Sequence, residues 1–475
     1  MQYCLSIFFF VFIGITPVIA QQDSSKVSFL SNRSNQIDTT SNQKLIISDI
    51  QIVGNKRTKP YIILREMTLK VGDIIPASEL QKQIEKSRNQ VFNTSLFIET
   101  NITTSSKMGD VVTLKVEVKE RWYLFPVPYF TLADRNFNQW WVIQHRDFNR
   151  VNYGIQATQY NLTGNNDPLS IWLINGYNKQ ISLRYTVPFF NNSLKHGFDI
   201  GYSYITQKEV TDSTDFNKQA FIKSDGYVFT YNRADISYSY RPDQYWRHSF
   251  RVGFTHERIG DTVLLVKQNY FPNKSTEFQF IDFTYRFRYQ NFDYNAYPTK
   301  GSSLEGYIYK RGLDNNSNLW QLGLGGIYVR PVYNKTYFKL SGSATIKSPS
   351  NNYFVNQPLL GYSSSSNLRG LEYYVIDGDM GALAQSTLFR EIYNCKLKTH
   401  LKSKNYNQIP FRFFFKLFAD IGYAHNDYPG NSMLNNKLLY TGGFGLDIVS
   451  FYDLAFRLEF SFNQLGQHGL FLHVH

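Results

Sequence analysis

One arginine stands out among the residues that could form a strong polar contact. Arg369 lies between Leu368 and Gly370 in the Ser-rich stretch SSSSNLRGLEYYVIDGD (363–379), where a solvated loop has no evident use for it. A guanidinium group can bind a carboxylate through two parallel hydrogen bonds, and a glycine beside it lets the backbone turn tightly. The chemistry that this stretch could supply is therefore an ion pair with a carboxylate elsewhere in the chain.

The carboxylate that fits is Asp420, in the stretch FRFFFKLFADIGYA (411–424). Every second residue from Phe411 to Tyr423 is apolar, and Asp420 is on the opposite face of this expected strand. If the apolar face meets lipid, Asp420 points into an enclosed interior, where a charge is costly unless it is paired. Two alternatives stay open at this point: Lys416 on the same face could pair with Asp420, and Arg369 could simply be solvated.

Other chemistry is scarce in the sequence. No G-x-S-x-G, H-E-x-x-H or phosphate-binding Gly loop is present, so we expect no enzyme and no cofactor. His468, His473 and His475 could in principle hold a metal ion, but no carboxylate adjoins them in sequence, and an ordinary terminal strand is favoured over a metal site.

Composition indicates an exported membrane protein built of strands. The chain of 475 residues has 35 Tyr and 39 Phe, yet its mean hydropathy is −0.36. After the N-terminal apolar run no segment approaches 18 consecutive apolar residues, which excludes a transmembrane helix and favours a barrel with one face in lipid and one in water. The net charge of +13 is spread through strand-like segments, so nucleic-acid binding is disfavoured, and a basic lumen or contact with anionic membrane lipid is expected.

Four segments are expected along the chain. Residues 1–20 read as a cleaved export signal and residues 21–43 as a disordered leader rich in Ser, Asn, Gln and Thr. Residues 44–120 predict the order β-α-α-β-β, with Thr58 and Ser78 as helix N-caps and one helical layer on a three-stranded sheet. Only Cys395 remains outside the signal, so neither an intrachain disulfide nor a cysteine metal site is possible in the mature chain.

Residues 121–475 alternate with period two in segment after segment and show no convincing helical periodicity. In IDFTYRFRYQ (281–290), aromatic residues occupy one face and Thr, Arg and Gln the other. At roughly 20–24 residues per strand with its turns, about 16 strands fit. The fold class predicted is an all-β transmembrane antiparallel barrel of about 16 strands, preceded by one small α+β domain.

The motifs along the chain resemble the BamA-like outer-membrane family, in a short form with one POTRA domain. I-x-I-x-G-N (50–55), ILREM (63–67), Gly72-Asp73 and VFNTSLF (91–97) are similar to POTRA landmarks. The resemblance implies that residues 44–120 form a POTRA domain and residues 121–475 an outer-membrane barrel. LRG (368–370) resembles the family's inward-folded sixth loop, and FADIG (418–422) its F-x-D-x-G strand.

The resemblance implies roles for three groups of residues. Leu368, Arg369 and Gly370 would fold into the barrel and meet Phe418, Asp420 and Gly422 as structural or gating residues, with Arg369 on Asp420. The stretch DYNAYPTKG resembles the family's periplasmic hairpin, in which Asp293, Pro298 and Gly301 would make a tight turn.

The function implied by the resemblance is assistance to client proteins that insert into or cross the outer membrane. The chain would lie in the cell outer membrane with its POTRA domain in the periplasm, where accessory proteins could bind it. The alternatives are a dedicated pore of the two-partner secretion type, and a passive pore or surface scaffold without insertase activity.

Overall fold

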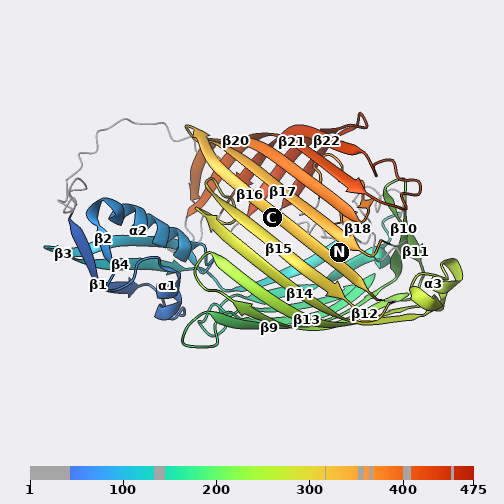
Figure 1. Cartoon of the computed structure of the whole chain (residues 1–475), viewed down its shortest axis with the longest axis horizontal. Helices are drawn as coiled ribbons and strands as arrows, with labels where there is room; N and C mark the ends of the chain where they lie inside the picture. Colours follow the sequence, from blue (N-terminus) through green and yellow to red (C-terminus); the bar gives the residue numbers. More distant parts are fainter. Residues whose placement is uncertain are drawn as a thin grey trace.

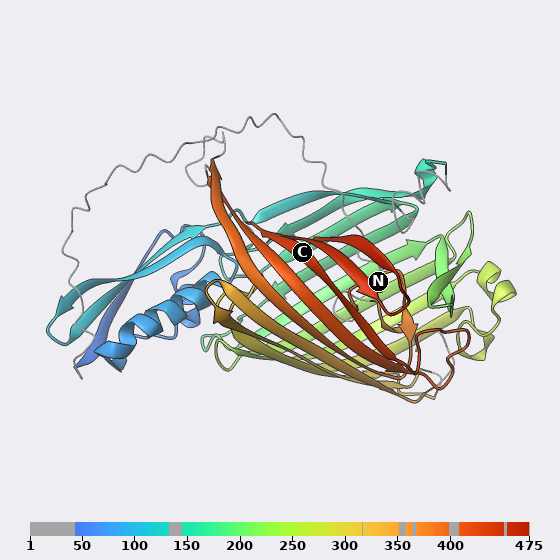
Figure 2. The same cartoon turned by 90° about the horizontal axis from the view of Figure 1, so that it is seen from above.

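The computed structural model describes residues 43–132, 145–315, 317–350, 358–362, 367–398, 408–450 and 454–474. The predicted export signal (1–20) lies outside these residues, as does all of the predicted leader except Gln43. Among the described residues, no helix is long and apolar enough to cross a membrane. Figure 1 shows a small domain at one end of a barrel, with β10, β11 and α3 at the opposite end, and Figure 2 shows the same arrangement from above.

The small domain has two helices on one sheet. Its elements are β1 (Lys44–Val53), α1 (Pro60–Glu66), β2 (Ile74–Pro76), α2 (Ala77–Phe92), β3 (Phe97–Met108) and β4 (Val111–Glu120). The predicted order of long elements is present, and Leu80, Ile84 and Val91 form the buried face of α2 as expected. Helices and sheet enclose a core that includes Leu45 and Leu114, neither of which is exposed.

Three details of this domain differ from the sequence prediction. The sheet has four strands in the order β2-β1-β4-β3, because the three residues of β2 add to the edge of β1. Neither predicted N-cap is correct: Lys59 precedes α1 and Pro76 precedes α2, and neither makes a capping hydrogen bond. The Thr58 hydroxyl instead lies 2.9 Å from the Tyr123 hydroxyl, in a tertiary contact that short-range patterns cannot reveal.

The barrel is a 16-stranded antiparallel sheet, which confirms the predicted fold class and strand number. Its strands are β5 (Leu124–Leu132), β6 (Val151–Gln159), β7 (Leu169–Gly176), β8 (Asn178–Val187), β9 (His196–Gln207), β12 (Phe229–Tyr240), β13 (Trp246–Ile259), β14 (Glu277–Phe292), β15 (Gly301–Arg311), β16 (Leu319–Tyr333), β17 (Thr336–Ser348), β20 (Met380–Lys398), β21 (Gln408–His425), β22 (Leu438–Val449), β23 (Ala455–Asn463) and β24 (His468–Val474). Each strand pairs with its neighbour along the chain, and β5 and β24 stand at the two ends of the strand order. Within the described residues no backbone pairing joins β5 to β24.

Shorter elements project from the strands. They are the hairpin of β10 (Glu209–Asp215) and β11 (Lys218–Lys223), the pair β18 (Pro358–Leu360) and β19 (Ile376–Asp377), the helix α3 (Asp261–Val266), and the 3-10 turns at Phe148–Arg150 and Pro272–Lys274. The helix α3 was not expected, since its six residues are too few to produce a helical period in the sequence.

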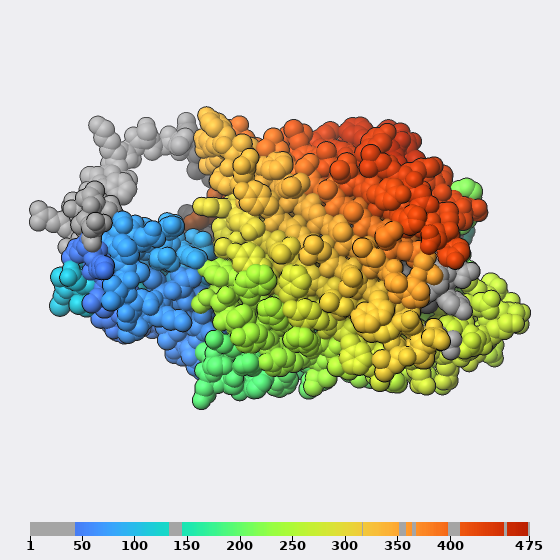
Figure 3. Space-filling model, viewed as in Figure 1, coloured from blue at the N-terminus to red at the C-terminus, as the bar shows by residue number. Residues whose placement is uncertain are grey.

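The space-filling view in Figure 3 shows the small domain packed against the end of the barrel wall. Glu66, at the end of α1, is 3% exposed and receives two hydrogen bonds of 3.1 Å from Arg241 of the barrel. Arg65 donates to the Leu194 carbonyl at 2.8 Å, and burial lowers the pKa of Arg65 to about 10 although Glu66 opposes this shift. The Arg65 guanidinium therefore stays charged at neutral pH beside the Glu66 carboxylate.

The hairpin between β14 and β15 also reaches the small domain. Residues 293–300 form a loop in which the Asp293 carboxylate accepts backbone N–H groups from Tyr294, Thr299 and Lys300 at 2.9, 3.0 and 3.1 Å. The backbone N–H of Asn295 donates to the Asn93 side chain at 3.0 Å. The loop is thus longer than a tight turn, and Asp293 organises it.

Gly301 ends this loop in a conformation that favours glycine. Its φ is +124°, and a Cβ built on it would lie 2.0 Å from the carbonyl oxygen of Asn291. A side chain there would force the first residues of β15 away from β14.

We predict that Gly301→Ala lowers the free energy of unfolding of the barrel by about 1–3 kcal/mol, the usual cost of one strained backbone residue, or more where the clash is not relieved. Urea unfolding of the purified protein in detergent measures this change. Ser302→Ala, one residue further along β15, is the control and should change stability by less than about 0.5 kcal/mol. Equal stability of the two variants would contradict the assigned backbone constraint.

Candidate functional site

The loop between β17 and β20 carries Arg369 into the barrel. Residues of β21 alternate as expected: Leu417, Ala419 and Ile421 are exposed on the outer face, whereas Phe418 and Asp420 are buried on the inner face. Asp420 thus faces the lumen from the middle of a paired strand, between Gln385 of β20 and Thr441 of β22.

Arg369 and Asp420 form a two-pronged ion pair. The Arg369 Nε donates to Asp420 Oδ2 at 2.9 Å, Nη2 donates to Oδ1, and the Arg369 backbone N–H also reaches Oδ2 at 3.2 Å. The Asp420 side chain is fully buried and receives a further hydrogen bond of 3.1 Å from Gln385. These donors satisfy both oxygens of the Asp420 carboxylate, so removal of either partner would leave a buried charge unpaired.

The remaining guanidinium donors are used as well. Arg369 Nη1 donates to the Thr387 hydroxyl at 3.0 Å, and Nη2 to the Ser386 carbonyl at 3.3 Å. The guanidinium lies over the ring of Phe418, 4.1 Å from its centroid, which adds a cation–π contact. A lysine could not make these contacts together, because it lacks the planar fork.

Two glycines leave the space that the loop occupies. A Cβ on Gly422 would lie 3.1 Å from the buried side chain of Leu368, so the absence of a side chain there lets Leu368 pack against β21. Gly370 has a φ of +91°, and a Cβ on it would lie 3.1 Å from Ser461 of β23. The structure thus brings together all six residues that the sequence singled out around this loop, on β21 and the loop itself.

The loop also contacts the last two strands. The side chain of Asn463, at the end of β23, donates to the Gly370 carbonyl at 2.7 Å. Gln467, just before β24, donates to the Tyr374 hydroxyl at 2.8 Å, and Tyr373 packs on Phe471 with ring centroids 5.4 Å apart. The loop therefore links the wall at β21 to the C-terminal edge of the sheet, which the sequence analysis did not anticipate.

Lys416 is not a partner of Asp420, contrary to the alternative considered from the sequence. Its ammonium lies 2.5 Å from Asp447 of β22 and 2.6 Å from Glu459 of β23. These partners lie on neighbouring strands. The residue pattern of β21 alone does not contain the register between strands, so it could not reveal them.

Among the described residues, His468 and His473 do not form a shared metal site. His468 lies against Phe460 and Phe462, with centroids 5.9 and 6.3 Å away, and His475 lies outside the described residues. His473 lies near two carboxylates that are distant in sequence, at 3.3 Å from Glu459 and 3.7 Å from Glu372. These three side chains place ligand atoms within 4.8 Å of one another. Because Glu459 already holds Lys416, the arrangement is better described as a chain of ion pairs.

A second charged network lines the opposite wall of the lumen. Asp235 of β12 accepts from Arg184 at 2.8 Å, and Asp282 of β14, which is fully buried, accepts from Arg233 at 2.9 Å and from Arg251 at 3.0 Å. The sequence analysis placed polar residues on this face but did not pair them. In both networks the carboxylates are bound by arginine or lysine side chains, and neither network presents a nucleophile aligned with a general base.

We predict that Arg369→Ala and Asp420→Ala each lower the free energy of unfolding of the barrel by about 3–5 kcal/mol, because each leaves its buried partner unpaired. The double variant should lose clearly less than the sum of the two losses. Denaturant unfolding of all four proteins gives the coupling energy. Arg390→Ala, which removes an exposed arginine of β20, is the control and should have little effect. Simple additivity of the two losses would contradict direct contact.

Comparison with known proteins places the N-terminal domain in a family. Residues 45–121 match the POTRA family, described as surface antigen variable number repeat. Over 80 residues the chain is 32% identical to the outer membrane protein assembly factor BamA of Nitratidesulfovibrio vulgaris (strain Hildenborough). That match covers 17% of this chain and 10% of the relative, so the chain spans about a tenth of the relative's length.

Solved structures with a similar arrangement include BamA from Haemophilus ducreyi lacking POTRA domains 1–3, with a TM-score of 0.49 and 16% identity over 91% of this chain and 84% of that one. CdiB from Escherichia coli has a TM-score of 0.46 and 10% identity, over 94% of this chain and 92% of that one. The match of residues 45–121 assigns the N-terminal domain to the POTRA family. The chain joins this POTRA domain to a sixteen-stranded antiparallel barrel.

Proposed function

We propose that the protein lies in the outer membrane, with its POTRA domain in the periplasm, and helps client proteins to insert into or cross that membrane. The observation that carries the proposal is a POTRA domain held against the mouth of a barrel by the buried contact of Glu66 with Arg241. A domain placed there can pass an extended client segment directly to the barrel, so that the segment does not cross open solvent.

The edge of the POTRA sheet supports the first step of this proposal. β3 stands at the end of the strand order and, in the described part of the chain, pairs only with β4. Its twelve residues are long enough for an extended client segment to add as a further strand, whereas β2 at the other edge has three. We assign client capture to β3 on this basis.

The ends of the barrel sheet support the second step. β5 and β24 each have one paired neighbour among the described residues. An unpaired strand edge in lipid leaves backbone groups unsatisfied, so a client strand that pairs there satisfies both chains. The loop with Arg369 contacts Asn463 and Gln467 beside β24. It is therefore positioned to control how accessible the unpaired edge of β24 is to a client strand.

We predict that depletion of the protein in its native host lowers the amounts of integral outer-membrane barrels, because their insertion would lose its assisting surface. Quantitative proteomics of purified outer membranes measures this. Complementation with the unaltered chain should restore these amounts, and complementation with Glu66→Gln, which weakens POTRA docking, should restore less. Glu79→Gln, on the exposed side of α2, is the matched control and should restore fully.

The alternatives give different results in the same experiment. A dedicated secretion pore would leave the outer-membrane proteome unchanged and deplete one or a few secreted proteins. A passive pore or scaffold would change neither set. Either result would contradict the proposed assistance to membrane insertion.

A further inference from the structure

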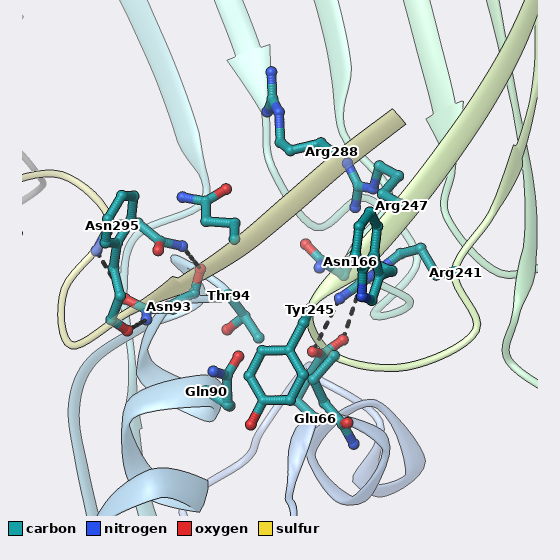
Figure 4. A pocket seen from close by; sticks show the side chains of 14 residues that line it. Glu66, Gln90, Asn93, Thr94, Asn166, Arg241, Tyr245, Arg247, Arg288 and Asn295 are labelled. Carbon is teal, nitrogen blue, oxygen red and sulfur yellow. Dashed lines mark hydrogen bonds and ion pairs between the residues drawn. The ribbon is translucent and has the colours of Figure 1, made fainter. Parts of the chain in front are cut away.

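A polar cavity lies at the junction of the POTRA domain and the barrel. It has a volume of about 230 Å³ and is shown in Figure 4. The POTRA domain contributes Glu66, Gln90, Asn93 and Thr94. The barrel contributes side chains from its turns and strand ends, which are Asn166, Arg241, Gln244, Tyr245, Trp246, Arg247, Arg288, Gln290, Phe292 and Asn295.

Positive charge exceeds negative charge in the cavity lining. Three arginines face one carboxylate, that of Glu66. Both Glu66 oxygens are taken by Arg241, and Arg65 adds a third contact of 3.1 Å. Glu66 therefore has little capacity left to neutralise the other two arginines of the cavity.

Those two arginines lie directly opposite each other. Arg247 of β13 pairs in register with Arg288 of β14, where like charges are destabilising. Arg288 has a partner outside the cavity, an exposed ion pair of 3.0 Å with Glu305. Arg247 makes no ion pair or hydrogen bond with any residue in the described ranges.

Strand parity directs Arg247 away from lipid. Its neighbours Trp246 and His248 belong to the outer aromatic face, where His248 stacks on Tyr285 with centroids 6.2 Å apart. Arg247 and Arg288 share the other face, toward the cavity and the lumen, and Figure 4 shows both on the barrel side of the cavity.

We propose that this cavity binds a small oxyanion of the phosphate class, held chiefly by Arg247 with Arg288 beside it. A guanidinium fork matches the oxygen atoms of such an anion, and the side-chain amides of Gln90 and Gln290 offer neutral donors. The volume of about 230 Å³ is sufficient for a hydrated small anion.

Two sources could supply this phosphate chemistry, a free anion and a lipid headgroup. The inward position of Arg247 favours the free anion, because a headgroup would have to leave the lipid face to reach it. A bound anion would contact groups from both domains and so favour the docked POTRA domain by mass action. The proposal rests on the cavity and its charges and does not depend on the proposed function.

The test is a calorimetric titration of inorganic phosphate into the full chain in zwitterionic detergent, in chloride buffer of constant ionic strength. We expect saturable binding at one site. Arg247→Gln should weaken the affinity at least about tenfold, the usual effect of losing a charge-assisted hydrogen bond. Arg286→Gln is the matched control: Arg286 lies on the same face of β14, contacts Tyr307, and is not part of the cavity lining, so its loss should leave the affinity unchanged.

Several results would overturn the proposal. The first is the absence of saturable phosphate binding. The second is an equal loss of phosphate affinity in Arg247→Gln and Arg286→Gln, which would indicate diffuse attraction by a basic lumen. If Arg247→Gln fails to fold, Arg247→Lys keeps the charge without the fork and should still weaken binding. Titration in phosphatidylcholine nanodiscs with and without phosphatidylglycerol separates the two sources. Equal affinity supports the free anion, and loss of phosphate binding with phosphatidylglycerol overturns that assignment in favour of the headgroup.

Discussion

The ion pair between Arg369 and Asp420 is the interaction on which the inner organisation of the barrel depends. A carboxylate on the lumen face of a strand needs a partner, and a long loop needs a fixed point if it is to stay inside. One contact meets both needs, since Asp420 accepts hydrogen bonds from both the backbone N–H and the guanidinium of Arg369. The stacking of Arg369 on Phe418 and the packing of Leu368 against Gly422 follow from this position.

From this fixed point the loop extends to the C-terminal strands. Gly370 passes close to Ser461, and Asn463 and Gln467 bind the loop beside β24. At the barrel end next to the POTRA domain, the buried contact of Glu66 with Arg241 fixes the small domain in a comparable way. Each contact joins an arginine and a carboxylate that are far apart in sequence. Both contacts are shielded from water, and the attraction between opposite charges is stronger in such surroundings than in water.

Sequence patterns predicted the layers of the structure but not most of its contacts. Period-two alternation was sufficient to predict a barrel and to place Asp420 on the lumen face, because the lipid face requires apolar side chains at every second position. The predicted number of about 16 strands came from the length of residues 121–475, and the structure has 16. The contact between Arg369 and Asp420 could not be predicted from alternation, because a loop has no periodicity. Its prediction came from the resemblance of LRG and FADIG to family motifs.

What could not be predicted depends on register and tertiary contact. Lys416 pairs with Asp447 and Glu459 rather than Asp420, and only the alignment of β21, β22 and β23 determines this. The expected caps at Thr58 and Ser78 were wrong because propensity is weak: Thr58 bonds to Tyr123 instead. The short strand β2 and the helix α3 are too brief to leave a pattern in the sequence.

Cysteine labelling tests most directly whether the loop lies inside the barrel. Leu371, two residues after Arg369, is 3% exposed, whereas Tyr373 is 56% exposed. In a background without Cys4 and Cys395, the account predicts that Leu371→Cys in the folded protein reacts far more slowly with a water-soluble maleimide than Tyr373→Cys. It also predicts that adding Asp420→Asn makes the two rates similar. Equally fast labelling of both positions with Asp420 intact would contradict the inward-held loop.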